Sequence, residues 1–337
     1  MFWKALPGRI WLFSLLLIVG LGAAFLVILS WWVKPTITNQ LLDQQQTVTR
    51  AEASNIASFF QTFGNSVAVL AKLSSMESWD EHTQSDLDAF ITQWSDSGLV
   101  AGVALTDRRG VVKFDSDVLE TRDLGASLAD RDYFSWAKNR PGEGEYLVGA
   151  SVVSRMGGTK GQIVIPVVSP VFQNGVFAGA VVTSAELEPL TEHYLELMKV
   201  SDATDVYLIG AQGDLLYNSA APEEVGMNVF GAGEEPFLGD QTLSDSLKSA
   251  LNTIEEGVLT TDGRLISYSP VPLGDRNWLL VMASPDQQVV DTIAPFYMRQ
   301  TAIFLLFSLS ILFYGAVIAR ESQVRGGLDT KTPQKRL

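Results

Sequence analysis

The residues best suited to hold a small molecule lie close together in the segment 124–138, LGASLADRDYFSWAK. In this segment Arg131 is followed within five residues by Tyr133, Phe134 and Trp136. A guanidinium group offers N–H donors in a fixed fork that fits a carboxylate, and aromatic rings exclude water and enclose an organic ligand. The segment indicates an anion-binding pocket. The alternative is that the aromatic side chains are core residues and that the arginine pairs with a neighbouring surface acid.

A second group with chemical potential is the acidic run formed by Asp115, Asp117, Glu120 and Asp123. Carboxylates at alternate positions supply the hard oxygen ligands that Ca²⁺ prefers. The run lacks the glycine and the bidentate glutamate that a calcium loop needs at fixed spacing. We therefore expect a solvated loop and no metal site.

Histidine and cysteine usage argues against an enzyme. The chain has no cysteine and two histidines, His82 and His193, and it contains no HExxH, GxSxG or phosphate-binding-loop motif. The missing cysteines exclude disulfides, thiolate zinc sites and cysteine nucleophiles. We predict a non-enzymatic protein with no cofactor. A hydrolase that uses one of the two histidines is the alternative.

The net charge excludes another class of protein. The 337 residues include 38 acidic and 24 basic side chains, which give a formal net charge of −14. A nucleic-acid-binding protein needs a basic face instead, so we predict no nucleic-acid partner. The chain is nonetheless apolar, with 47% hydrophobic residues and a mean hydropathy of +0.16. Apolar residues must therefore be concentrated in part of the chain.

The apolar residues are concentrated at the two ends. Residues 10–33 form a run of 24 residues without a charge, and residues 301–319 form a run of 19. At 1.5 Å per residue, the first run reaches about 36 Å and exceeds the roughly 30 Å core of a bilayer. Both runs predict membrane-spanning helices, although a signal peptide is the alternative for the first.

Basic residues set the predicted topology. Lys and Arg flank both apolar runs on their terminal sides, so the positive-inside rule places both termini in the cytoplasm. The acidic bulk of the chain is then periplasmic or extracellular, anchored in the inner membrane. The predicted segments are a cytoplasmic N-terminus 1–9, a first span 10–33, an extracytoplasmic region 34–300, a second span 301–319 and a cytoplasmic tail 320–337.

The first part of the predicted extracytoplasmic region has the periodicity of a helix. Apolar residues recur at three- and four-residue steps over 36–76, which predicts one long amphipathic helix, and a second helix is expected over 85–95 within the helical part 36–97. The first helix is longer than a globular core requires. Its membrane-near half could therefore pair with a copy of itself and give a homodimer.

Strand-like segments follow and end in a helix over 186–200. They are rich in Val, Ile and aromatic residues and are separated by Gly, Asn and Asp, so they predict one antiparallel sheet in a module that spans 98–200. The predicted strands are 99–106, 110–115, 145–153, 161–171 and 176–184.

A weak internal repeat predicts a second, smaller module over 201–293. Residues 206–219, VYLIGAQGDLLYNS, repeat the rhythm of 103–116, VALTDRRGVVKFDS. The second copy is expected to contain a mostly polar helical connector over 237–259 and to end with the strand 277–283.

The order of these elements resembles the double Cache family, the PAS-like extracytoplasmic sensor regions of bacterial chemoreceptors, histidine kinases and cyclic-dinucleotide enzymes. The resemblance rests on the long helix after the first span, the D-R-D-Y-F segment at 130–134, the strand pair QIVIPVVSPV and VFAGAVVTSAEL, and the ending NWLLVMASPDQ. It covers about residues 37–293. It implies an α+β fold in which two transmembrane helices flank a tandem of PAS-like antiparallel-sheet modules on a long N-terminal helix.

The resemblance also implies a site. Small ligands bind in the membrane-distal module of the family, and the R-x-W-Y segment of its amino-acid-binding branch corresponds here to 131–134. That branch has a Tyr where this chain has Ala126, and an Asp for the ligand amine where this chain has Ser184. Both departures argue against an α-amino acid and leave three alternatives open, namely a carboxylate, another small polar metabolite, or a module that binds no ligand. The expected ligand-binding residues are Arg131, Tyr133, Phe134, Trp136, Tyr146, Ser151, Arg155, Thr183 and Ser184.

The sequence therefore predicts a membrane-anchored extracytoplasmic sensor of a small ligand. The tail 320–337 leaves no room for a kinase core or a methyl-accepting coiled coil, so we expect the signal to pass through a partner protein in the membrane or at its inner face. Two alternatives stay open, namely a scaffold subunit of a membrane complex and a piece of a larger receptor.

Overall fold

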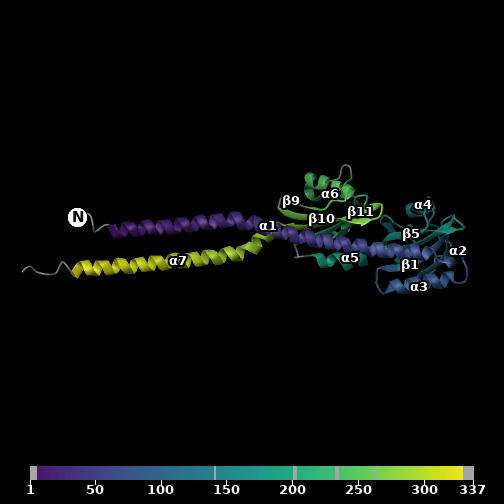
Figure 1. Cartoon of the computed structure of the whole chain (residues 1–337), viewed down its shortest axis with the longest axis horizontal. Helices are drawn as coiled ribbons and strands as arrows, with labels where there is room; N and C mark the ends of the chain where they lie inside the picture. Colours follow the sequence, from purple (N-terminus) through teal and green to yellow (C-terminus); the bar gives the residue numbers. More distant parts are fainter. Residues whose placement is uncertain (1–5, 140–141, 200–202, 232–234, 262, 329–337) are drawn as a thin grey trace, which may run out of the picture. The chain divides into compact units, whose positions relative to one another are not determined.

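The computed structural model describes residues 6–139, 142–199, 203–231, 235–261 and 263–328. The chain divides into two units, one built from residues 1–41 and 286–337 and the other from residues 42–285. Figure 1 follows the chain through both. The outermost parts of the two predicted cytoplasmic ends, 1–5 and 329–337, lie outside the described residues.

A single long helix, α1 (Leu6–Ala71), begins the chain and contributes to both units. The predicted first span 10–33 and the predicted amphipathic helix 36–76 are thus parts of one helix, which ends five residues earlier than expected. A short helix, α2 (Ser74–Ser78), follows. Within the unit 42–285, α1 buries Ala53, Ile56, Phe60, Phe63 and Val67, whose three- and four-residue spacing places them on one face.

The first module is an antiparallel sheet with the strand order β2-β1-β6-β5-β3, and β4 also pairs with β5. The predicted strand 145–153 is broken into two short strands around Gly149, where an added Cβ would lie 2.7 Å from the ring of Pro166. The other predicted strands are confirmed with small shifts at their ends. The strands are β1 (Val100–Asp107), β2 (Val112–Asp117), β3 (Leu147–Val148), β4 (Val152–Val153), β5 (Ile163–Gln173) and β6 (Val176–Glu186).

Different helices pack on the two faces of the first sheet. Val103 and Leu105 of β1 lie in the same buried cluster as the residues of α1, whereas Ala104 between them lies in a cluster with the residues of α4. This alternation is the two-residue period of a strand. The helices and turns around this sheet are α3 (Thr83–Ser95), α4 (Asp132–Asn139), η1 (Gly157–Thr159), α5 (Leu187–Leu195) and η2 (Glu196–Met198).

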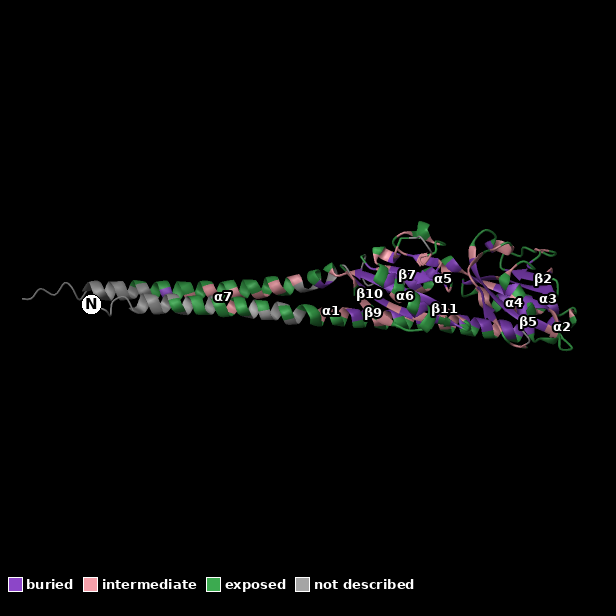
Figure 2. Cartoon of the chain, turned by 90° about the horizontal axis from the view of Figure 1, so that it is seen from above, coloured by how far each residue is buried: buried purple, intermediate pink, exposed green. Residues whose placement is uncertain are grey.

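The second module has the equivalent strand order, β8-β7-β11-β10-β9, as the predicted internal repeat requires. The predicted connector 237–259 is not merely polar, because α6 (Gln241–Thr253) buries Leu243, Leu247 and Leu251 and the segment runs into β9. The elements are β7 (Asp205–Ile209), β8 (Leu215–Asn218), η3 (Pro222–Glu224), η4 (Phe237–Gly239), α6, β9 (Gly257–Thr261), β10 (Arg264–Leu273) and β11 (Arg276–Pro285). In Figure 2 the buried residues gather in the two sheets and on the part of α1 beside them.

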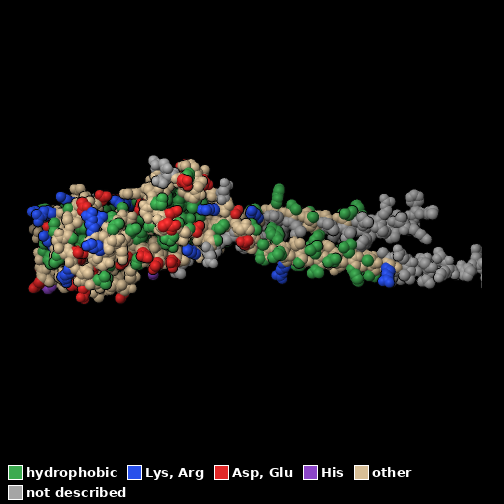
Figure 3. Space-filling view, turned by 180° about the vertical axis from the view of Figure 1, so that it is seen from behind, with side chains coloured by type: hydrophobic (Ala, Val, Ile, Leu, Met, Phe, Trp, Pro, Cys, Tyr) green, Lys and Arg blue, Asp and Glu red, His purple; other side chains and the backbone are tan. Residues whose placement is uncertain are grey.

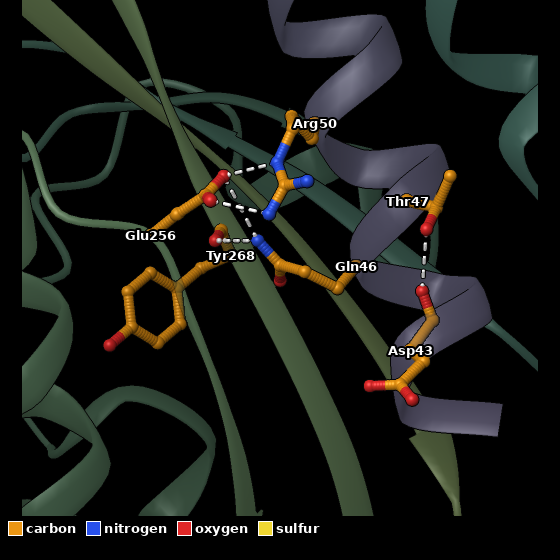
Figure 4. Close-up of polar contacts among 6 residues, drawn as sticks. All are labelled: Asp43, Gln46, Thr47, Arg50, Glu256 and Tyr268. Carbon is orange, nitrogen blue, oxygen red and sulfur yellow. Dashed lines mark hydrogen bonds and ion pairs between the residues drawn. The ribbon is translucent and has the colours of Figure 1, made fainter. Parts of the chain in front are cut away.

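Polar contacts also attach α1 to the second module (Figure 4). The Arg50 guanidinium forms a two-pronged ion pair with the Glu256 carboxylate, with Nε donating to Oε2 at 2.7 Å. Gln46 Nε2 donates to Glu256 Oε2 and to the carbonyl oxygen of Tyr268, both at 3.3 Å. The Arg50 and Glu256 side chains are 59% and 39% exposed, so their ion pair sets the register of helix against sheet more than it stabilises it.

The last helix, α7 (Gln287–Leu328), belongs to the other unit and contains the predicted second span. Its stretch Val289–Val317, with a mean hydropathy of 1.8, is the one helical segment of the described residues that is long and apolar enough to cross a membrane.

The contact of α1 with the second sheet can be tested at Phe60. Its ring packs edge-on against Trp278 of β11, with ring centroids 5.3 Å apart, and Trp278 is only 2% exposed. Phe60→Ala should lower the free energy of unfolding by about 3–5 kcal/mol, measured by urea unfolding of the full chain. The matched control on the same helix is Val69→Ala, at a residue that is 64% exposed, and it should change that free energy by less than about 0.5 kcal/mol. Equal effects of the two substitutions would contradict this packing.

Candidate ligand-binding site

A cavity of about 80 Å³ lies on the face of the first sheet turned away from α1. Strands β1, β2, β5 and β6 form its floor, and segments around 128–133 and 152–159 form its walls. Small residues of β1, Ala101 and Gly102, line the floor. The cavity therefore has room because β1 carries almost no side-chain volume at these two positions.

Arg131 reaches this cavity from the residue directly before α4. Its carbonyl oxygen accepts hydrogen bonds from the N–H groups of Phe134 and Ser135 at 3.1 and 3.0 Å, which fixes its backbone against the first turn of the helix. Its guanidinium donates from Nη2 to the carbonyl oxygen of Val153 at 2.8 Å. The Nε atom is buried and has no hydrogen-bond partner in the described residues. The group is thus oriented by one bond and has donors left for an acceptor.

Arg155 lines the same cavity from the opposite wall segment. Its Nη1 atom donates to Asp130 Oδ1 at 2.9 Å and lies 2.8 Å from Oδ2. This hydrogen bond holds the pKa of Asp130 below its ordinary value. Because both partners are about half exposed, the pair is a solvent-screened contact that positions Arg155.

Three of the predicted site residues, Tyr133, Thr183 and Ser184, contribute hydroxyl groups to the lining of the cavity. Burial raises the pKa of Tyr133 to about 12, so its phenol stays protonated at neutral pH. Thr183 Oγ1 donates to the carbonyl oxygen of Gly102 at 2.7 Å, and its lone pairs remain available as acceptors. Ser184 lines the cavity next to it.

The acidic run is only in part the solvated loop that the sequence predicted, because Glu120 is exposed but the two aspartates on β2 are not. Asp115 and Asp117 are 4% and 7% exposed and line the cavity from β2. Asp117 Oδ1 accepts hydrogen bonds from the N–H groups of Leu119 and Thr121 at 2.8 and 3.1 Å, and Oδ2 accepts one from Gly158 at 3.0 Å. The expectation was wrong for these two carboxylates because they turn inward and satisfy the backbone of the loops around them.

Asp115 is the most perturbed of these acids. Burial raises its pKa above the ordinary value, and the charges of Asp117 and Asp123 raise it further, while Arg122 acts in the opposite direction. Its Oδ2 atom accepts a hydrogen bond from the N–H group of Asp123 at 2.8 Å. Among the described residues, no group of carboxylates and histidines has the arrangement of a metal site.

The structure brings together Arg131, Tyr133, Arg155, Thr183 and Ser184 at the cavity and places the other four predicted residues elsewhere. Phe134 is buried in the core beside Phe177, with ring centroids 6.1 Å apart, and Trp136 packs against the same cluster. Tyr146 lines a larger groove beside α1 and the second sheet. Ser151 donates to Asp214 Oδ2 of the second module at 2.9 Å.

Sequence reasoning missed the cavity role of Asp115 and Asp117, together with Ser154 and Thr159. A signal was present for the two aspartates, because residues two apart on a strand share a face. No comparable signal marked Ser154 and Thr159, which reach the cavity through an irregular wall segment that contains η1.

Comparison with known proteins identifies a family for the chain. A family model described as Cache domain matches residues 30–293. Among curated proteins, none matches the chain.

Several solved structures share the fold. A structure described as methyl-accepting chemotaxis protein X has a TM-score of 0.57 at 17% identity, and the match covers 74% of this chain and 99% of that one. The ligand-binding domain of the Pseudomonas fluorescens chemoreceptor CtaA, in complex with L-serine, has a TM-score of 0.51 at 16% identity, with 74% and 99% covered. An extracellular ligand-binding receptor from Desulfohalobium retbaense has a TM-score of 0.50 at 14% identity, and the match covers 75% of this chain but only 40% of the receptor.

The raised pKa of Asp115 predicts a pH dependence of stability. Between 3.8 and the raised value, the folded state keeps a proton that the unfolded state has released. The contribution of this group is therefore fully present below pH 3.8 and declines as the pH rises toward the folded pKa. The stability of the wild type minus that of Asp115→Asn, measured by urea unfolding from about pH 3 to about pH 7, should fall with rising pH and then level off. A difference that grows with pH would contradict the burial of an ionisable Asp115.

Proposed function

Because this chain belongs to the Cache domain family, as its residues 30–293 match that family's model, we propose that it is a membrane-anchored extracytoplasmic sensor that binds a small carboxylate in the first module. The single observation that carries the proposal is the Arg131 guanidinium, which lines the cavity with a buried Nε atom that has no partner among the described residues. A buried donor without an acceptor is costly, and a carboxylate oxygen would satisfy it through a charge-assisted bond.

The polar groups around Arg131 suit a ligand with more than one polar end. Tyr133, Thr183 and Ser184 offer hydroxyl groups to the same cavity, and Arg155 adds a second cation. Asp115 lies in the lining too, so a purely anionic ligand would meet a nearby carboxylate. We therefore infer a carboxylate that also carries a hydroxyl or another hydrogen-bond donor.

The volume of the cavity limits the size of the ligand. About 80 Å³ suits a molecule of a few heavy atoms and excludes a peptide or a nucleotide. The amino acid L-serine occurs in the complex of the CtaA domain, which shares the fold. Amino acids therefore belong in the test library, although Ser184 here lacks the carboxylate that would hold an amine.

We place the chain in the inner membrane with two spans, residues 10–33 and 301–319, both termini in the cytoplasm and residues 34–300 outside. The apolar stretch Val289–Val317 supports the second span. Support for a helix pair comes from Gly22 of α1, where a Cβ atom would collide with the Phe304 ring of α7. Small residues let transmembrane helices approach closely in this way.

Signalling would run through α1 and a partner protein. Phe60 of α1 packs against the second module, and its neighbour Phe63 lies in the same buried cluster as residues of the first sheet. A ligand that draws the cavity walls together would shift the population of two arrangements of this helix, which a partner in the membrane or a second copy of the chain would read. The role is one of recognition rather than catalysis.

The ligand proposal is tested at Arg131. Arg131→Ala should abolish the rise in unfolding temperature that a carboxylate library gives to the wild-type chain, because the anion loses its charged donor. The matched control is Arg109→Ala, at an exposed arginine of the same module outside the cavity lining, and it should keep the full response. If no compound stabilises the wild type, or if Arg131→Ala responds like the wild type, the proposal fails.

The topology is tested by cysteine labelling, because the chain has no cysteine of its own. In intact cells, a membrane-impermeant maleimide should label Ser85→Cys, at an exposed position on α3, and should not label Thr330→Cys near the C-terminus. After permeabilisation both variants should react. Labelling of Thr330→Cys in intact cells, or protection of Ser85→Cys, would contradict the proposed orientation.

A further inference from the structure

A second cavity, of about 280 Å³, lies where the two modules meet. Its lining comes mostly from the first module, through residues 130–133, 149, 150, 152 and 155, and it includes Arg276 at the start of β11 in the second module. It shares Arg131 and Arg155 with the ligand cavity. The cavity thus touches both modules at once.

The lining is unusually rich in guanidinium groups. Arg131, Arg155 and Arg276 face it, together with the carboxylates of Asp130 and Asp132. Asp130 is already paired with Arg155 through Nη1, and Asp132 is exposed. The cations therefore outnumber the acids that could neutralise them inside the cavity. Figure 3 shows Lys and Arg side chains gathered on one face of the molecule over the first module.

Arg276 is the residue whose placement most needs an explanation. Its side chain is half-buried and has no hydrogen-bond or ion-pair partner among the residues that the structure describes. A guanidinium that loses water without gaining an acceptor destabilises the fold. The Nε atom of Arg131 is buried outright and has no partner either, whereas the nitrogen atoms of Arg276 keep contact with solvent. An acceptor with two or more oxygens would satisfy donors from both modules.

We propose that the cavity between the modules is an anion site, in which Arg276, Arg131 and Arg155 together hold one oxyanion, either a phosphate group or a carboxylate. Guanidinium forks bind both of these groups through paired charge-assisted bonds. Binding would add a bridge between the modules beside the hydrogen bond from Ser151 to Asp214, which joins them at 2.9 Å. The site shares Arg131 and Arg155 with the 80 Å³ cavity, whereas Arg276 lies outside that lining, so Arg276 is the residue at which the proposal is tested.

The test uses the full chain in nanodiscs and inorganic phosphate as the probe. Sodium phosphate should raise the unfolding temperature of the wild type above that in sodium chloride of equal ionic strength, and calorimetry should give a saturable isotherm. Arg276→Gln should weaken phosphate binding by at least about tenfold. Lys248→Gln removes an exposed cation on α6 outside this lining, and it should bind as the wild type does.

A second variant keeps the test decisive if Arg276→Gln does not fold. Arg276→Lys retains the charge but loses the fork, so it should bind phosphate with an affinity between those of the wild type and the glutamine variant. Succinate, titrated in the same way into the wild type and into Arg276→Gln, separates the sources: weakened binding of phosphate alone in the variant identifies a phosphate group, and weakened binding of both identifies any oxyanion.

Two results would overturn the proposal. One is that neither phosphate nor succinate stabilises the wild type more than chloride does. The other is phosphate binding that is unchanged in Arg276→Gln and in Arg276→Lys. Arg276 lies only in the lining of the cavity between the modules, so its variants remove no residue of the 80 Å³ cavity, and the failure of this proposal is distinguishable from the failure of the proposal that Arg131→Ala tests.

Discussion

The packing of one helix against two sheets is the constraint on which the rest of this molecule depends. Helix α1 buries Ile56, Phe60, Phe63 and Val67, and the same cluster takes in Leu105 of the first sheet and Trp278 of the second. With its inner face committed to α1, each sheet has only its outer face left for other uses. The two modules share a strand order, so the difference between them lies in the segments that pack on the outer face of each sheet.

In the second module, α6 covers this face with Leu243, Leu247 and Leu251, which lie in one buried cluster with residues of the sheet. In the first module, α4 covers only part of the face, and polar wall segments cover the rest. Gly102 belongs to this arrangement, because a Cβ there would lie 3.0 Å from the Cβ of Asp117. A cavity with charged walls therefore forms where the duplicated module would otherwise have a closed apolar layer.

Much of this fold was predictable because it follows local periodicity. The helical face of α1, most strands of the two sheets and the repeat appear in the residue pattern, whereas β9 was not predicted, and the Cache family predicted from the pattern is confirmed. The site was less predictable because it depends on the directions in which side chains point, and residue spacing does not determine these directions. Tyr133 and Phe134 are neighbours on α4, yet the first lines the cavity and the second enters the core. The hydrogen bond from Ser151 to Asp214 could not be predicted from local sequence, because it joins residues of two modules.

Arg131 is the point at which local and long-range constraints meet. Its backbone is fixed by the first turn of α4, its Nη2 atom is held by Val153, and its side chain faces both the ligand cavity and the cavity beside Arg276. The N–H groups of a guanidinium have a fixed geometry. An acceptor in one cavity that reorients the Arg131 guanidinium therefore changes which N–H donors face the other cavity. A ligand in the first cavity and an oxyanion in the second would therefore draw on the same donors. By the reciprocity of linked binding, any factor by which one changes the affinity for the other applies equally in the opposite direction.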